Sequence, residues 1–282
     1  MRINTNVSSL TAQEAAQNTT KSITSSLEKL STGLRINKAS DDASGLAIAD
    51  KLRTQATSIN QGISNGNSAV ALLQIADKSM GEQSNILDTI KAKLIQANTD
   101  TTSTEGRTSI GKDIKKLLEQ LNNIAKQTNY NGRQLISNST GNGGASSHVF
   151  QVGEKSSDTI TMGVVNSNTT GLALTGLSGN IGASGTLTKA NAASAQTAIN
   201  AAINTLNGFR GDIGSTQNQV ESAVRNLMTQ ATNVKAAESI IRDVDYAAES
   251  ANFNKQNIIA QAGSYAISQA NAVQQNVTRL LQ

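Results

Sequence analysis

The chain contains no cysteine and no proline, and aromatic residues make up only 2% of its 282 residues. Without cysteine there can be no disulfide, no thiol nucleophile and no thiolate metal site. Without proline, no residue is forced to break a helix by lacking a backbone N–H group. Aromatic side chains are the largest core fillers, so their scarcity argues against a thick central core. We therefore expect an elongated, mainly α protein, an antiparallel helical bundle or coiled coil with a small β-hairpin in the middle.

Charge and hydropathy exclude two further classes of partner. The formal net charge is a mild +4, and no Lys/Arg cluster or set of stacking aromatic residues indicates nucleic-acid binding. No apolar run approaches the roughly 18 residues of a membrane-spanning helix. The N-terminus also lacks the apolar core of a cleaved signal peptide. Composition alone therefore suggests a cytoplasmic protein with no nucleic-acid or membrane partner.

Catalytic and metal-binding groups are scarce as well. His148 is the single histidine, which excludes a two-histidine metal motif. The four carboxylates Asp41, Asp42, Asp243 and Asp245 could be read as an acid–base or metal constellation. Because no His or Cys accompanies them, helix capping and salt bridges are the simpler interpretation. We expect no enzyme activity, no metal and no cofactor.

Two apolar stripes with alternating steps of four and three residues favour packing of helix against helix. The first stripe consists of Leu52, Ala56, Ile59, Ile63, Gly66, Val70, Leu73, Asp77 and Met80. The second consists of Val220, Val224, Leu227, Ala231, Val234, Glu238 and Ile241. We interpret the first stripe mainly as core within the chain.

The first stripe belongs to a predicted long helix that reaches about residue 97. We expect Ser40 to cap this helix, with Asp41 and Asp42 in its first turn, where negative charge is favourable. A turn over residues 99–107 then leads into a shorter amphipathic helix that should fold back antiparallel and end at a turn over residues 129–132.

The middle of the chain, residues 137–189, is polar and rich in Ser, Thr and Gly. Within it, Val149 to Val152 and Thr159 to Met162 predict a β-hairpin closed near residues 153–158. From Ala190 the sequence becomes helical again to its end, with an interruption near residues 209–211.

Sparser apolar residues mark both ends of the chain. Residues 1–38 contain few apolar side chains. The free energy gained by burying them hardly offsets the conformational entropy lost when their backbone becomes ordered. We therefore expect both ends to become helical only when neighbouring copies cover them. The predicted subunit contacts are Ile3, Val7, Leu10, Ile23, Leu27, Leu30, Leu34, Ile258, Ile259, Tyr265, Val273, Val277, Leu280 and Leu281.

One long stretch resembles a known family. Residues 30–49, LSTGLRINKASDDASGLAIA, are similar to the N-terminal signature of bacterial flagellin. Shorter matches are INTN at residues 3–6, QTNYNG at 127–132, GSTQN at 214–218, IRDVDYAAE at 241–249 and RLLQ at 279–282. The resemblance covers about residues 1–136 and 190–282 and fades between them.

The resemblance implies a subunit of the extracellular flagellar filament, with three parts. Residues 1–38 and 239–282 would form an inner core domain, residues 39–136 and 190–238 an outer core domain, and residues 137–189 a hairpin and variable surface loop. It also implies export without a cleaved signal peptide, which replaces the cytoplasmic interpretation. The implied partners are further copies of the chain, an export chaperone, the filament cap and hook-junction proteins.

Two other roles stay open. A hook–filament junction protein shares the terminal pattern, and a secreted adhesin or innate-receptor ligand is a conceivable secondary role. Flagellins sensed by a Toll-like receptor present an Arg and then Glu-Leu on the long helix, where this chain has Thr89 and then Ala92-Lys93. Arg makes forked hydrogen bonds that Thr cannot. We expect weak receptor activation through the face that holds these three residues and Asp113.

The Ser/Thr-rich middle has two interpretations, a solvated loop or a region of O-glycosylation such as several flagellins carry. The candidate acceptors are Ser139, Thr140, Ser167, Thr169, Thr170, Thr175 and Ser178.

Overall fold

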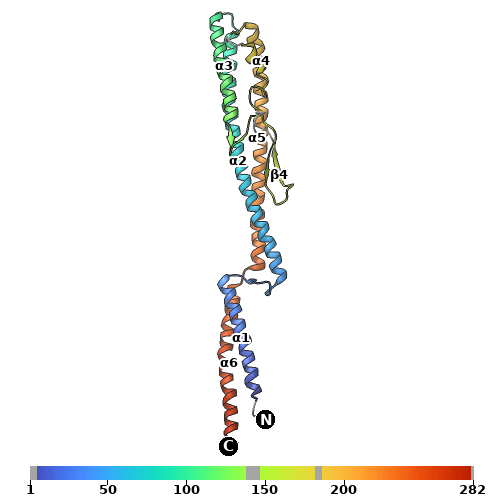
Figure 1. The fold of residues 1–282 in the computed structure, drawn as a ribbon, viewed down its shortest axis with the longest axis vertical. Coiled ribbons are helices and arrows are strands. Elements are labelled where there is room, and N and C mark those ends of the chain that lie inside the picture. The colour runs from blue at the N-terminus through green and yellow to red at the C-terminus, as the bar shows by residue number, and fades with distance from the viewer. Residues whose placement is uncertain (1–4, 138–146, 182–185, 281–282) are drawn as a thin grey trace. The chain divides into compact units, whose positions relative to one another are not determined.

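The computed structural model describes residues 5–137, 147–181 and 186–280. The chain divides into two compact units, Met1–Ala56 with Thr232–Gln282 (unit 1) and Thr57–Ala231 (unit 2). The elements follow in the order α1 (Val7–Thr32), α2 (Ala43–Asn98), α3 (Thr104–Gln127), β1 (Asn129–Tyr130), β2 (Arg133–Gln134), β3 (His148–Gln151), β4 (Thr159–Met162), α4 (Thr175–Asn180), α5 (Lys189–Arg242) and α6 (Tyr246–Leu280) (Figure 1). The predicted mainly α fold with a small hairpin is confirmed.

Two interleaved heptad rows of α2 are buried in unit 2. One row consists of Ile59, Gly66, Leu73, Met80, Leu87 and Leu94, and the other of Gly62, Ala69, Ala76, Gln83, Ile90 and Ala97. The predicted stripe matches the first row. It misplaces the second by one residue, because it chose the bulkier Ile63 and Val70, which are only half-buried, over their small neighbours Gly62 and Ala69.

Small residues in both rows let neighbouring elements approach α2 closely. A Cβ added at Gly62 would lie 2.5 Å from the backbone oxygen of Val152, and one added at Gly66 would meet the side chain of Val224 on α5. Asn65, between them, donates from Nδ2 to the backbone oxygen of Gln151 at 3.1 Å. The hairpin and α5 are therefore seated on α2 where it lacks side chains.

Helix α5 runs without a break, so the predicted interruption near residues 209–211 is wrong. Gly208 and Gly211 lie inside the helix with open space around them, so neither marks a turn. Arg210 faces α2 and forms an ion pair with Asp77, Nε to Oδ1, at 2.9 Å. The interruption was predicted wrongly because these glycines lie on the solvent-facing side of the helix. The opposite side of α5 is packed and keeps the helix continuous.

The start of α2 also differs from the prediction. The helix begins at Ala43, and Asp42 is its cap, accepting from the backbone N–H of Gly45 at 2.8 Å. Asp41 lies before the helix, where its Oδ2 accepts from the backbone N–H groups of Asn37 and Lys38 at 3.0 Å. These backbone hydrogen bonds lower the pKa of Asp41. Two carboxylates thus hold the turn before α2, and Ser40 caps nothing there.

Both short antiparallel pairs are two-stranded. The expected turn at residues 129–132 joins β1 to β2, and its central residues Asn131 and Gly132 have φ of 51° and 78°, as a type I′ turn requires. The predicted hairpin is confirmed as β3–β4, with His148 opposite Met162 and Gln151 opposite Thr159. Two side chains of β4, Ile160 and Met162, are buried, so the hairpin packs through one face.

Unit 2 is held together by polar as well as apolar contacts. Gln83 of α2 is fully buried, and its Nε2 donates to the backbone oxygens of Leu121 and Ser167 at 3.1 and 3.2 Å. Ser167 in turn donates from Oγ to the backbone oxygen of Ile136 at 3.0 Å. One amide therefore ties α2 to α3 and to the segment that follows β4.

The seating of the hairpin on α2 predicts opposite effects of two glycine substitutions. Gly62→Ala should lower the free energy of unfolding by about 1–3 kcal/mol, because the new methyl overpacks against a backbone oxygen that cannot rotate away. Gly81→Ala, in the same helix with nothing within 4 Å of the added Cβ, should raise it by about 0.5–1 kcal/mol. Urea unfolding of the full chain measures both. Equal stabilisation by the two substitutions would contradict this packing.

Candidate assembly surface

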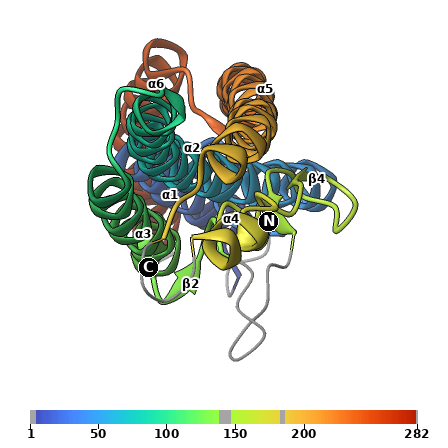
Figure 2. The same ribbon diagram turned by 90° about the horizontal axis from the view of Figure 1, so that it is seen from above.

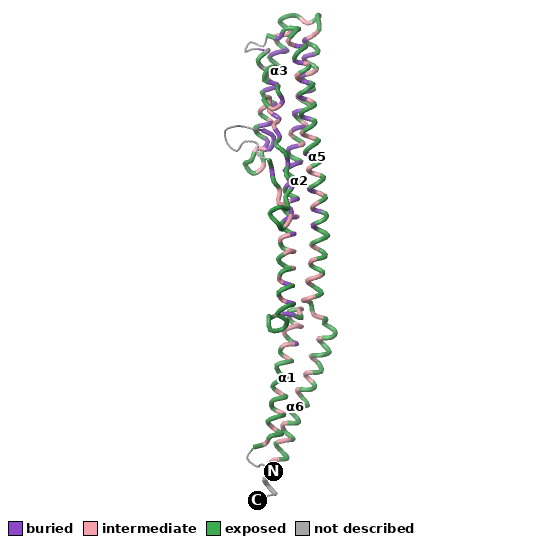
Figure 3. Tube along the Cα trace, turned by 90° about the vertical axis from the view of Figure 1, so that its right-hand side faces the viewer, coloured by how far each residue is buried: buried purple, intermediate pink, exposed green. Residues whose placement is uncertain are grey.

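The two units differ sharply in how much apolar surface they bury (Figure 3). Unit 2 has a continuous core that includes Leu73, Met80, Leu87, Ile114 and Ile199. Among the described residues of unit 1, the only buried apolar side chains are Ile36 and Ala49, and neither belongs to α1 or α6. Helices α1 and α6 therefore present their apolar residues at the surface.

Local sequence explains why α1 is a helix with defined ends. The side chain of Asn6 caps its start by accepting from the backbone N–H of Ser9 at 3.1 Å. Gly33 ends it in the left-handed conformation, with φ of 74° and its N–H donating to the backbone oxygen of Lys29. Several of its hydroxyls donate to the carbonyl four residues earlier, as Thr11 does to Val7 and Thr24 to Thr20. The helix thus satisfies much of its own polar surface.

Helix α6 is capped from its own sequence and pairs with α1. Asp245 Oδ1 accepts from the backbone N–H groups of Ala247 and Ala248 at 2.9 and 3.1 Å. At the other end of the pair, Asn6 Nδ2 donates to the backbone oxygen of Ala270 at 3.0 Å. Figure 2 shows the two helices of this pair from above.

The loops beside this pair are tied to each other within unit 1. The backbone N–H of Arg35 donates to the oxygen of Arg242 at 2.7 Å, and that of Val244 donates to the oxygen of Gly33 at 3.0 Å. The Arg35 guanidinium donates to the backbone oxygen of Ile241 at 2.7 Å. These hydrogen bonds join residues 33–35 to residues 241–244, and we call the joined segments the junction.

This junction was not predicted from the sequence, although one signal was present. Gly33 follows directly on a helical stripe, which is a typical helix-ending position. A Cβ added there would lie 3.1 Å from the hydroxyl of Tyr246, so the junction favours glycine for space as well as for φ. Arg35 and Arg242 carried no such signal, because their partners are backbone atoms distant in sequence.

Apart from Leu34, the predicted contact residues that the structure describes lie on the helix pair α1 and α6. Val7, Leu10 and Leu27 are 59%, 55% and 54% exposed. On α6, Ile258, Ile259, Tyr265 and Val273 are also exposed, whereas Ile23, Leu30 and Leu34 are half-buried. Ile3 and Leu281 lie outside the described residues, as do the side chains of Val277 and Leu280. Ile48, Ile240 and Tyr246 of unit 1 are also exposed and were not predicted.

We expected the two ends of the chain to become helical only in contact with neighbouring copies, and the structure differs from this expectation. Both α1 and α6 are helices within the single chain. Their mutual pairing buries Ser26 and half-buries Leu30, which supplies part of the cover that we expected only from other copies. The remaining exposed apolar residues still need a partner.

The predicted receptor-face residues fall on two neighbouring helices of unit 2. Thr89 is exposed, and its hydroxyl donates to the backbone oxygen of Asn85 at 2.9 Å. Lys93 of α2 forms an ion pair with Asp113 of α3, Nζ to Oδ2, at 3.0 Å. Ala92 is exposed beside them. The structure thus joins Lys93 with Asp113 and leaves Thr89 bonded to its own helix.

The glycosylation candidates divide by burial. Ser167 has no exposed surface, and its hydroxyl donates to Ile136, so this candidate is withdrawn. Thr169 is half-buried, with its hydroxyl 3.1 Å from Asn122 Oδ1. Thr170 and Thr175 are exposed. Ser139 and Thr140 lie outside the described residues, as does the side chain of Ser178.

The surface of α1 and α6 is suited to apolar association. Within the described ranges, no helix is long and apolar enough to cross a bilayer. The exposed apolar residues of α1 and α6 fit packing against other helices.

Comparisons with known proteins match both halves of the chain. Residues 3–140 match the family model of the bacterial flagellin N-terminal helical region, and residues 196–281 match that of the C-terminal helical region. The segment between the two matches contains the β3–β4 hairpin.

Individual relatives agree with these matches. The flagellar filament 33 kDa core protein of Treponema phagedenis is 34% identical over the whole of both chains. Flagellin B of Helicobacter pylori is 48% identical over 159 residues, which are 56% of this chain and 30% of that protein. The chain thus spans less than a third of that longer relative.

A solved structure shares the fold. It is a candidate flagellar hook-associated protein from Vibrio parahaemolyticus, with a TM-score of 0.61 and 14% identity, covering 72% of this chain and 99% of that chain. At this identity the likeness concerns the fold alone. The two family models and the relative of equal length show that this chain belongs to the bacterial flagellin family.

Proposed function

We propose that this chain is a structural subunit that polymerises into the extracellular flagellar filament used for swimming. The observation that carries the proposal is the helix pair α1–α6, in which both ends of α1 and the start of α6 are capped but Val7, Leu10, Ile258 and Tyr265 are exposed. Such a surface is stable in water only when other helices cover it. The name of the relative of equal length, a flagellar filament core protein, supports the same role.

The contacts proposed within the filament are the terminal apolar residues predicted from the sequence. We assign residues 1–38 and 239–282 to an inner core domain, residues 39–136 and 190–238 to an outer core domain and residues 137–189 to a variable surface region. The difference in burial between the units supports this division. Compact unit 1 extends somewhat further into the long helices, to Ala56 and from Thr232.

Export and its partners follow from family membership. We propose secretion without a cleaved signal peptide, with an export chaperone, the filament cap and hook-junction proteins as partners. N-terminal sequencing of filaments tests the export route, since loss of a leader would contradict it. O-glycosylation is proposed at exposed Thr170 and Thr175, and an intact mass equal to the calculated 29.3 kDa in native filaments would remove that proposal.

The two alternative roles have less support. The hook-associated likeness rests on a shared fold at 14% identity, whereas identity to a flagellin reaches 48%. No observation in the described residues favours an adhesin. Formation of long filaments by the purified chain alone would separate a filament subunit from a junction protein.

A charge placed on α6 should block polymerisation and leave the stability of the single subunit nearly unchanged. Ile258→Glu should change the free energy of unfolding by less than about 0.5 kcal/mol, because the side chain is 66% exposed. It should raise the critical concentration for polymerisation at least tenfold, because the contact would lose about 1.5–3 kcal/mol of apolar burial and enclose a charge. Light scattering and sedimentation measure the critical concentration.

The matched control is Gln261→Glu, which adds the same charge at an exposed position of α6 without removing an apolar side chain. It should assemble near the wild-type concentration. Normal polymerisation of Ile258→Glu would show that this face of α6 is not a subunit contact.

Receptor activation should be weak. Thr89 cannot make the forked hydrogen bonds of Arg, and Lys93, which forms an ion pair with Asp113, stands where flagellins sensed by the receptor have Leu. In a Toll-like receptor reporter assay, the combined change Thr89→Arg, Ala92→Glu and Lys93→Leu should raise potency at least tenfold. Thr229→Arg, at an exposed position of α5, is the control and should leave potency unchanged. Full potency of the unaltered chain would refute the hypothesis.

A further inference from the structure

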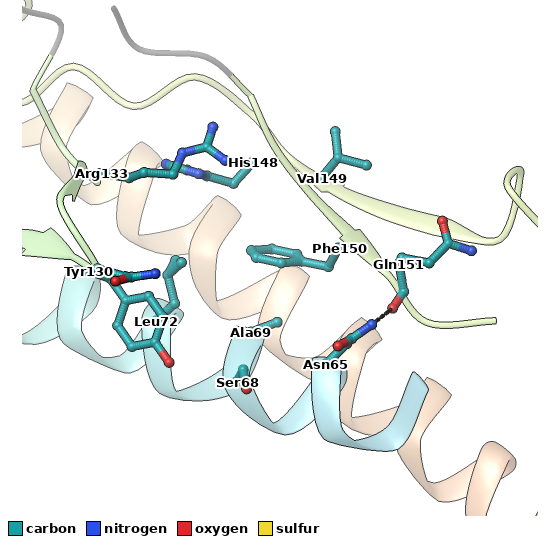
Figure 4. Close-up of a pocket in the computed structure, with 11 residues that line it drawn as sticks. Asn65, Ser68, Ala69, Leu72, Tyr130, Arg133, His148, Val149, Phe150 and Gln151 are labelled. Atoms are coloured by element: carbon teal, nitrogen blue, oxygen red, sulfur yellow. Dashed lines mark hydrogen bonds between the residues drawn. The ribbon is translucent and has the colours of Figure 1, made fainter. Parts of the chain in front are cut away.

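Unit 2 contains a cavity of about 400 Å³ between α2 and the two strand pairs. Figure 4 shows its walls, with Arg133 and His148 close together on one side and Phe150 projecting from β3 toward α2. The lining residues are Asn65, Ser68, Ala69, Leu72, Tyr130, Asn131, Arg133, His148, Val149, Phe150 and Gln151. A mostly apolar hollow with a few convergent polar groups is the usual form of a small binding site.

The cavity contains positive charge without a counter-ion. Arg133 is exposed on β2, and among the described residues no carboxylate forms a salt bridge with it. None of the lining residues is acidic. The sequence itself has no Asp or Glu between Asp50 and Asp77 or between Glu119 and Glu154. Within the described part of the chain, the guanidinium donors therefore have no partner and face an anion-poor surface.

His148 adds a second group that would respond to an anion. The side chain is 7% exposed. Burial lowers its pKa, the nearby Arg133 charge lowers it further, and a backbone hydrogen bond with Gln134 acts in the opposite direction. The other titratable group in the lining is Tyr130, and the lining residues on α2 are all uncharged. An anion beside Arg133 would offset the charge that now opposes protonation of His148.

The remaining wall is apolar and held in place. Leu72 and Ala69 of α2 are buried opposite Phe150. The hydrogen bond from Asn65 to the backbone of Gln151 fixes β3 against α2. The cavity thus has a preformed apolar wall on one side, which could contact the apolar part of a ligand. On the other side it has the Arg133 guanidinium.

We propose that this cavity binds a carboxylate carried on an apolar or aromatic stem, with Arg133 holding the carboxylate beside His148 and with Phe150, Leu72 and Ala69 contacting the stem. Arg matches a carboxylate through two parallel hydrogen bonds, which makes it the preferred cation for this role. This site goes beyond the filament role, because it lies in unit 2 and not on α1 or α6. The carboxylate belongs either to a free small molecule or to an acidic side chain of a neighbouring copy.

The test uses NMR on the full-length monomer with labelled histidine, because the single histidine gives one set of ring resonances. Phenylacetate should shift these resonances saturably and raise the pKa of His148. Its uncharged counterpart phenylacetamide should not. Arg133→Gln should weaken phenylacetate binding tenfold or more, whereas Lys126→Gln, a neighbouring cation outside the lining, should change it less than twofold.

A second arm distinguishes the two sources of the carboxylate. If a neighbouring copy supplies it, polymerisation alone should shift the His148 resonances in the same direction, and this shift should be lost in Arg133→Gln filaments. If the ligand is free, filaments should still bind phenylacetate without that shift. The proposal is overturned if phenylacetamide acts like phenylacetate, if Arg133→Gln binds as wild type, or if neither ligand nor assembly moves the resonances. The monomer arm stands even if the chain does not polymerise.

Discussion

The burial of the two heptad rows of α2 is the interaction on which the rest of this structure depends. In unit 2 these rows meet α3, α5 and the strand pairs, so Leu73, Met80 and Leu87 have no exposed surface. Close contact is possible because the second row contains Gly62, with Val152 directly against it. Interiors packed this densely do not tolerate added volume. The hairpin, the cavity and helix α3 are all positioned by this packing.

Helices α1 and α6 lack such a third element. They are capped, they pair with each other and their loops are joined through Arg35 and Arg242. Pairing covers only one side of each helix, and the apolar residues on the other side stay exposed. A helix pair with an uncovered apolar face behaves like half of a bundle. Polymerisation would complete that bundle, which is how a chain with few aromatic side chains can still build a stable assembly.

Much of this arrangement could be predicted from the sequence, because long helices repeat their apolar residues at a period that reads directly from the chain. The Ile59–Met80 row and the β3–β4 hairpin were found in this way. The second row of α2 was misplaced because it contains small residues. Gly62 and Ala69 are buried because other elements pack closely against the helix there, and the spacing of large apolar residues does not reveal such positions. The junction was missed because Arg35 binds carbonyl oxygens about 206 positions away. The false break near residues 209–211 shows that helical glycine with open space around it carries no stop signal.

Of the candidate functional residues, only the apolar ones on α1 and α6 could be predicted from the sequence. Val7, Leu10 and Ile258 stood out because no core was available for them, and they are exposed in the structure. Ser167 looked like an exposed acceptor because its segment is polar, yet its hydroxyl serves a buried backbone oxygen. The cavity at Arg133 and His148 depends on three segments far apart in sequence, so only the folded chain assembles it.

Hydrogen exchange on the same chain before and after polymerisation tests the central claim most directly, that α1 and α6 are completed by neighbouring copies. Amides of α1 and α6 should exchange quickly in the monomer, because few buried contacts oppose their local opening. Amides of α2 between Leu73 and Leu94 should already be strongly protected there. In the polymer, α1 and α6 should gain protection to a similar level. Strong protection of α1 and α6 in the monomer, unchanged by assembly, would contradict the account.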